Sequence, residues 1–218
     1  KRINNSFKIK DFKGDVLPVY NVNYRQKNPF EKISNKSRKY ILECFDRAMK
    51  FAKNKKIIGF INCPVSKEFL FKKKHQGITE FLSKKYKLYG KEVMLIYNKE
   101  LSVSPITTHI PLNQVKSKIK KELIVNKVKV INTFYKKFFN KKPFFAILGL
   151  NPHNFYASKK DSEKKIIANA IKILKKNKIK LLGPLPADSV FTIYKKYSFD
   201  VIIGMYHDQV LAPFKALY

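Results

Sequence analysis

The sequence lacks the patterns that would place it across a membrane or in the secretory pathway. No apolar run approaches the roughly 18 residues of a spanning helix, and the basic N-terminus has no apolar core of a secretory signal. The two cysteines, Cys44 and Cys63, have no CxxC spacing, which indicates reduced thiols in a cytosol. We therefore expect a cytoplasmic protein with no membrane partner. The first residue is not methionine, which predicts a processed chain or a fragment.

Several short motifs of nucleotide and hydrolase chemistry are also absent. The chain contains no GxGxxG, no GxxxxGK[ST], no GxSxG and no HExxH. A standard dinucleotide fingerprint or P-loop therefore does not explain any use of a nucleotide by this protein.

Acidic residues are scarce, and the formal net charge is +32. Only four of the 47 basic residues are arginine, the residue that reads phosphates and bases through a bidentate fork. Tryptophan is absent and there are only seven glycines, a composition typical of an AT-rich coding bias. We interpret the charge mainly as compositional drift, so a nucleic acid is not the expected partner. The alternative, a polyanion binder, predicts retention on DNA or RNA that falls steeply with salt.

Apolar residues alternate between strand-like runs and helical stripes, which predicts an α/β fold with mostly parallel sheets. The clearest helix covers 161–176, where one apolar stripe is formed by Ile166, Ile167, Ala170, Ile171 and Leu174. The predicted helices are 37–52, 79–86, 113–139 (continuous or broken in two), 161–176 and one around 188–197; the predicted strands are 57–62, 92–97, 101–108, 144–150, 179–183 and 200–206.

Three of the four histidines follow predicted strands. His109 ends ITTH, His153 ends LGLNPH, and His207 ends IIGMYH. Ligands of open α/β sheets bind at the carboxyl edge, where these residues would meet. Three neutral imidazoles suit a divalent ion such as zinc, cobalt or nickel, although each histidine alone could also be a surface residue.

Three further polar residues follow strands or lie close to His207. Asp188 follows GPLPA, where it is either a helix N-cap or an active-site acid. Asp208 is adjacent to His207, where it could orient the imidazole ring. Lys215 lies among apolar residues and is either a surface residue or an anion clamp.

At these residues the chain resembles the 4-hydroxythreonine-4-phosphate dehydrogenase family of vitamin B6 biosynthesis. Motif order and spacing agree from about residue 15 to the end. The matching stretches are TTHIPL (107–112), GLNPH (149–153), GPLPADSVF (183–191) and MYHDQVLAPFKALY (205–218), with weaker matches at NCPVSK (62–67) and GITEFL (77–82).

The resemblance implies an isocitrate/isopropylmalate dehydrogenase-like α/β fold, with mostly parallel sheets, flanking helices and an active site in an interdomain cleft. We expect residues 1–65 plus 201–218 to form a partial first α/β domain and 66–200 a second one. The implied reaction is metal-dependent oxidation of 4-phosphooxy-L-threonine by NAD or NADP, followed by decarboxylation to 3-amino-2-oxopropyl phosphate.

The resemblance also implies a role for each candidate residue. His109, His153 and His207 would hold the divalent metal, which is zinc, magnesium or cobalt, at a site completed across a homodimer interface. Thr79 and Lys215 would contact the phosphorylated amino-acid substrate. Asp188 would be an active-site acidic residue that works near the reacting alcohol. The orienting role of Asp208 rests on its position beside His207 and not on the resemblance.

The chain departs from the family at three places. The glycine-rich N-terminal segment and the region after FKALY are absent, and GLNPH is followed by NFYASKKDSE instead of a glycine-rich stretch. Ile78 replaces the substrate-binding histidine of the family's GHTE motif. We therefore expect little activity from this chain alone. Two alternatives stay open: a dehydrogenase of another phosphorylated hydroxy acid, such as 4-phospho-erythronate, or a non-catalytic metal-binding fragment of the same fold.

Overall fold

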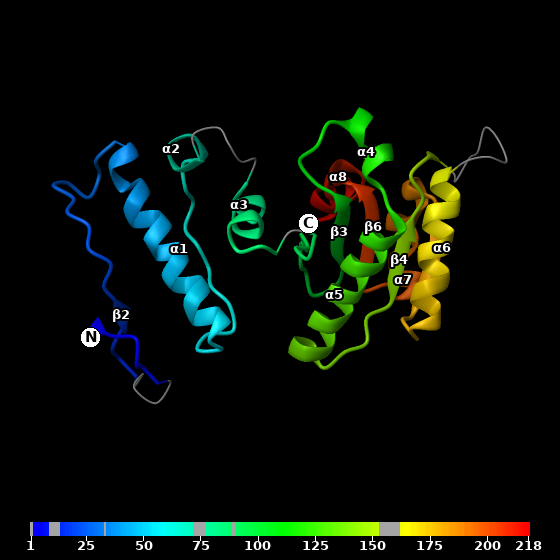
Figure 1. Cartoon of the computed structure of the whole chain (residues 1–218). Helices are drawn as coiled ribbons and strands as arrows, with labels where there is room; N and C mark the ends of the chain where they lie inside the picture. The colour runs from blue at the N-terminus through cyan, green and yellow to red at the C-terminus, as the bar shows by residue number, and fades with distance from the viewer. Residues whose placement is uncertain (1, 9–13, 33, 72–76, 89, 153–161) are drawn as a thin grey trace. The chain divides into compact units, whose positions relative to one another are not determined.

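The computed structural model describes residues 2–8, 14–32, 34–71, 77–88, 90–152 and 162–218. The contacts divide the chain into two units, residues 1–77 and 78–218. Both hydrophobic core clusters of the described residues lie in the second unit, and Figure 1 shows the elements of both units. In the described residues no helix is long and apolar enough to cross a membrane.

The first unit is built around one amphipathic helix, α1 (Arg38–Lys53). The rings of Phe7 and Tyr20 pack edge-on against Phe51, with centroids 5.1 and 5.3 Å from it. Arg38 donates a hydrogen bond from Nε to the carbonyl of Leu70, 2.9 Å away. The remaining elements are β1 (Arg2–Ile3), β2 (Val19–Tyr20), the 3-10 helix η2 (Asn35–Ser37) and α2 (Lys67–Phe71), with β1 parallel to β2.

The strand predicted at 57–62 is wrong, because these residues form no regular structure. Ile58 and Ile61 are exposed, at 90% and 101% of their reference surface. No strand in the described part of the unit pairs with this segment, so its backbone groups have no ladder to join. An apolar sequence alone does not make a strand without such a partner.

The second unit is a four-stranded parallel sheet in the order β3-β6-β4-β5, with helices on both faces. This confirms the expected α/β class with parallel strands. The strands are β3 (Ser102–Thr107), β4 (Phe145–Leu148), β5 (Leu181–Leu185) and β6 (Val201–Tyr206). The helices are α3 (Ile78–Lys85), α4 (Leu112–Lys118), α5 (Lys121–Phe139), α6 (Ser162–Lys176), α7 (Ala187–Tyr197) and α8 (His207–Leu217).

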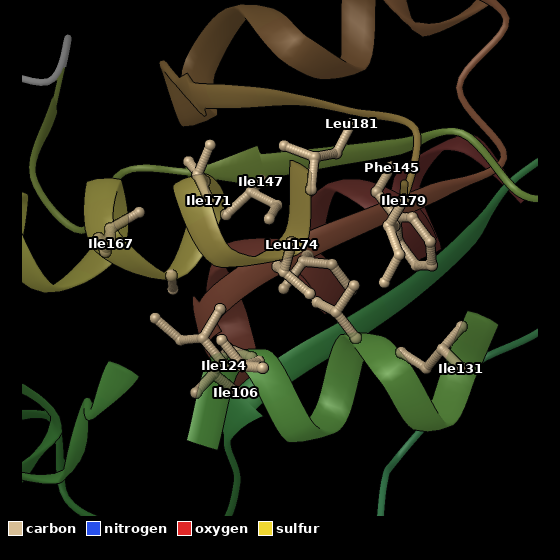
Figure 2. Packing of buried hydrophobic residues seen from close by; sticks show 14 of the residues in the cluster. Ile106, Ile124, Ile131, Phe145, Ile147, Ile167, Ile171, Leu174, Ile179 and Leu181 are labelled. Atoms are coloured by element: carbon tan, nitrogen blue, oxygen red, sulfur yellow. The ribbon is translucent and has the colours of Figure 1, made fainter. Parts of the chain in front are cut away.

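The two faces of the sheet bury separate clusters, because successive strand residues point to opposite sides. On β4, Phe145 and Ile147 face α5 and α6, whereas Ala146 and Leu148 face α7 and α8. Figure 2 shows the first cluster, in which Ile124 of α5 and Leu174 of α6 close over the sheet. All four residues of β4 are fully buried, as expected for a central parallel strand.

The strand predicted at 92–97 is wrong. Residues 92–97 form no strand and share only one antiparallel bridge with β3, between Ile96 and Val103. The predicted helix at 113–139 is broken in two at Ile119, whose backbone is extended, which is one of the two forms that the sequence left open. Residues 201–218 lie in the second unit, where β6 is hydrogen-bonded between β3 and β4.

Candidate functional site

His109 lies just beyond the carboxyl end of β3 and is held by a glutamate from α3. Its Nδ1 is 2.7 Å from Oε1 of Glu80. A carboxylate only accepts, so Nδ1 donates this bond, and in the neutral imidazole Nε2 then carries the lone pair that can bind a metal. The backbone at His109 has a φ of 28°, a left-handed conformation that non-glycine residues seldom adopt. Such strain persists where surrounding contacts enforce it, and functional sites often contain it.

His207 lies beside His109 because β3 and β6 are neighbouring parallel strands. Thr107 and Tyr206 are paired in register, so the chain leaves both strands at the same level. The two imidazole rings have centroids 5.7 Å apart. His207 is the first residue of α8, and its Nδ1 is 2.7 Å from Oδ1 of Asp208. This contact between Asp208 and Nδ1 of His207 is the one expected if Asp208 orients the imidazole ring.

A buried glutamine fixes the neighbouring end of β4. Gln209 accepts a hydrogen bond from the backbone N–H of Met205 (2.7 Å) and donates one from Nε2 to the carbonyl of Gly149 (2.8 Å). At Gly204 an added Cβ would lie 2.5 Å from a methyl carbon of Val210, so glycine is required for this close packing. The chain beyond β4 thus starts next to β6. His153 lies outside the described residues.

Behind His109 lies a small cavity of about 30 Å³ lined by charged side chains. Lys127 of α5 is only 7% exposed there, and burial lowers the pKa of its ammonium group against the opposing effects of Glu92 and Glu80. Burial raises the pKa of the Glu80 carboxyl, but hydrogen bonds from His109, from the backbone and from Thr108 hold it below its ordinary value. In the described structure Oε2 of Glu80 is buried without a hydrogen-bond partner. The complete lining is Thr79, Glu80, Glu92, Met94, Thr108, His109 and Lys127.

A larger cavity of about 260 Å³ opens on the other side, next to His207. Its lining combines polar side chains with three aliphatic ones, Leu112 and Val115 from α4 and Ile110 just before it. Such a mixture suits a small organic ligand with one polar end. Its lining is Thr107, Thr108, Ile110, Leu112, Val115, Tyr206, His207 and Asp208.

The other predicted residues lie farther from the two imidazoles. Thr79 is exposed in the first turn of α3 and lines the small cavity beside His109. Asp188 is exposed in the first turn of α7, beyond β5, which is separated from β6 by one strand and hence by about 10 Å. Lys215 lies in the last turn of α8, about 12 Å along the helix axis from His207.

The two imidazoles fit a shared divalent metal. With metal–nitrogen bonds of about 2.1 Å, two imidazoles on one ion have ring centroids roughly 5–6 Å apart, and the observed value is 5.7 Å. Both Nδ1 atoms face carboxylates, which is the usual arrangement when Nε2 binds a metal. Among the described residues no group of three or more His, Cys, Asp or Glu side chains converges on one point. A third ligand would therefore have to come from elsewhere, such as His153.

Three residues of the site were not found by sequence reasoning. Glu80 directly follows Thr79 in GITEFL (77–82), and Gln209 lies within MYHDQVLAPFKALY (205–218). Lys127 had a usable signal, because it is three residues after Ile124 and four before Ile131, on the buried stripe of α5. A lysine at such a position indicates nearby carboxylates.

The fold and the paired imidazoles define a parallel α/β protein with a candidate metal site at the carboxyl edge of its sheet. Comparison with known families agrees with this class. The chain belongs to the family described as pyridoxal phosphate biosynthetic protein PdxA, which matches residues 1–218. This confirms the family resemblance seen in the sequence.

Curated relatives and solved structures give the same family. A 4-hydroxythreonine-4-phosphate dehydrogenase from Sulfurihydrogenibium is 37% identical, over 96% of this chain and 67% of that protein. Another from Hydrogenobaculum is 34% identical, over 100% of this chain and 66% of that protein. A crystal structure from Burkholderia phymatum superposes with a TM-score of 0.72 at 28% identity, over 89% of this chain and 60% of that one. The chain thus spans at most about two thirds of these relatives.

Proposed function

We propose that this chain provides the metal site and part of the substrate site of a 4-hydroxythreonine-4-phosphate dehydrogenase. The reaction would be NAD- or NADP-dependent oxidation of 4-phosphooxy-L-threonine, with decarboxylation to 3-amino-2-oxopropyl phosphate. The observation that supports it is the pairing of His109 and His207, each with Nδ1 on a carboxylate, at the carboxyl edge of the sheet. The family and the relatives named 4-hydroxythreonine-4-phosphate dehydrogenase support a dehydrogenase of this substrate class.

His109 and His207 would hold a divalent metal through Nε2, with His153 as the third ligand in a homodimer. Bound at the substrate hydroxyl, the metal would lower its pKa, and the nicotinamide cofactor would accept hydride. Asp188 would take the hydroxyl proton, since it starts a helix at the same edge of the sheet.

Thr79 and Lys215 would bind the substrate. Thr79 lies beside His109 in the small cavity and offers a hydroxyl. The side chains of a helix tilt toward its N-terminus, so Lys215 reaches back along α8 in the direction of His207. A phosphorylated substrate would span the remaining distance, with its phosphate paired to the ammonium group.

Metal titration tests this proposal. We expect His109→Ala and His207→Ala each to weaken Co²⁺ or Zn²⁺ binding about 100-fold. Loss of a direct ligand lowers metal affinity at least as much as loss of a residue that only hydrogen-bonds to a ligand. Lys215→Ala should leave metal affinity unchanged and weaken binding of 4-phosphooxy-L-threonine in calorimetry. Unchanged metal affinity in the His109/His207 double variant would contradict the metal site.

A related substrate is the second candidate, favoured by Ile78. This residue begins α3 beside Thr79 and stands where the family pattern has histidine. Isoleucine donates no hydrogen bond to a phosphate or carboxylate, so a different hydroxy acid, such as 4-phospho-erythronate, would bind with at least equal affinity. Calorimetry with both compounds against the metal-loaded protein separates the two candidates. Restoration of threonine-phosphate binding by Ile78→His would support the first.

A further inference from the structure

We propose that Glu80 is a positioning residue for His109, and that the buried Lys127 holds Glu80 in place. This inference rests on the proposed metal site and adds to it a chain of contacts that runs from the imidazole into the core. Glu80 belongs to α3, His109 follows β3, and Lys127 belongs to α5. Three separate elements therefore determine how one metal ligand is presented.

The contact between Glu80 and His109 fixes both the tautomer and the direction of the ring. Oε1 of Glu80 is 2.7 Å from Nδ1 of His109, which makes Nδ1 the donor and directs Nε2 away from α3. Thr108 also donates to Oε1, at 3.5 Å. Mutation of a side chain that holds a ligating imidazole in this way commonly lowers metal affinity 10- to 100-fold.

The second oxygen of the same carboxylate is available for a link to Lys127. Oε2 of Glu80 is buried and has no hydrogen-bond partner among the described residues, and Glu80 and Lys127 both line the small cavity. The cavity of about 30 Å³ has room for one water. A water there would accept from the ammonium group of Lys127 and donate to Oε2 of Glu80, which satisfies both buried groups.

Lys127 is itself fixed by its surroundings. It is 7% exposed on the core-facing side of α5, and the carboxylates of Glu80 and Glu92 both act on it. Glu92 in turn accepts a hydrogen bond from the hydroxyl of Ser83, 2.9 Å away. With His109 neutral, the two carboxylates and one ammonium leave one net negative charge behind the imidazole. That charge favours a cation bound at Nε2.

His207 provides an internal comparison. Its Nδ1 also contacts a carboxylate at 2.7 Å, but Asp208 is adjacent in sequence and its side chain is 83% exposed. The side chain of Glu80 is 30% exposed and belongs to a different element. A solvated carboxylate restrains its partner less than a partly buried one. Removal of Glu80 should therefore weaken metal binding more than removal of Asp208.

The test measures Co²⁺ affinity, by competition with a chelator, for Glu80→Ala, Glu80→Gln, Lys127→Met and Asp208→Ala, together with the visible absorption bands of bound Co²⁺. Glu80→Ala should weaken binding 10- to 100-fold and alter the bands. Glu80→Gln should recover part of the loss, because its amide oxygen still accepts from Nδ1. Asp208→Ala should have the smaller effect. Melting of the metal-free proteins shows whether each variant is folded.

Lys127→Met separates positioning from simple electrostatics. If Lys127 acted only through its charge, its removal would tighten Co²⁺ binding; positioning of Glu80 predicts binding about tenfold weaker. His109→Ala is the reference. If it leaves Co²⁺ binding unchanged, the proposed metal site fails. If it weakens binding while Glu80→Ala and Glu80→Gln match the parent chain, the metal site stands and the positioning role of Glu80 is overturned. Tighter binding by a folded Lys127→Met overturns the role of Lys127.

Discussion

Gly183→Ala is expected to destabilise the second unit by about 3–5 kcal/mol, from backbone strain and a steric clash together. Gly183 has a φ of 151°, where an L side chain is strained. A Cβ there would lie 2.5 Å from the carbonyl oxygen of Ile147 in β4, and a backbone atom cannot swing aside as a side chain can. Because whole domains are stable by only about 5–15 kcal/mol, this one methyl group should remove a large part of the total.

The position of Gly183 explains why the strand needs it. The register between β4 and β5 shifts between Ala146 and Leu148, so β5 has an extra residue at this point. The shift redirects the end of β5, from which α7 begins with Ala187 and Asp188. Urea unfolding measures the effect. Gly90 has a φ of 78° and open space around it, so Gly90→Ala measures the cost of backbone strain alone. An equal loss of unfolding free energy in both variants would contradict the clash at Gly183.

Gln209→Met is the second large expected effect, a loss of about 2–5 kcal/mol from two buried backbone groups left without partners. Gln209 is 8% exposed and bonds both the N–H of Met205 and the carbonyl of Gly149. Methionine is similar in length but provides neither the acceptor nor the donor. The two orphaned groups would then lie at the ends of β6 and β4, beside the imidazoles.

A matched control is Gln114→Met, on the exposed surface of α4. Its side chain makes no buried bond, so its unfolding free energy should change by less than about 0.5 kcal/mol. Urea midpoints of the two variants give the comparison directly. Similar stability in both variants would show that the Gln209 bridge contributes little. A loss of metal affinity in Gln209→Met is expected in addition, since His207 is two residues away.

The fold of the second unit was largely predictable because its elements obey local patterns. The stripe of 161–176 and the apolar runs of 144–150 and 200–206 match α6, β4 and β6. The predictions of secondary structure were wrong where pairing with a neighbouring strand decides whether a segment forms a strand. IIGFIN at 57–62 has strand-like residues but no strand beside it, and 92–97 reaches β3 through one bridge only. The segment after His207 was not predicted as a helix, and Pro213 within α8 weakens its helical signal.

The site was predictable only to the level of individual motifs. Strand-end positions indicated that His109 and His207 would meet, and the sheet order places them on adjacent strands. The partner of His109 could not be deduced, because Glu80 is 29 residues away and reaches the imidazole only through the packing of α3. The roles of His153, Thr79, Asp188 and Lys215 stay predictions, which the metal and substrate titrations address.

The sheet order also has a consequence for synthesis on the ribosome. β6 is made after β3, β4 and β5, yet it lies between β3 and β4 and pairs with both. Until residue 206 has left the ribosomal tunnel, β3 has no parallel neighbour among the described strands, and the edges of β3 and β4 that pair with β6 stay unpaired. Because β6 joins β3 to the other strands, we expect the described sheet to assemble only after β6 has been made, later than a sheet whose strands pair in order of synthesis. Residues 78–200 alone should accordingly show no cooperative unfolding by circular dichroism, and a sharp transition would contradict this order of assembly.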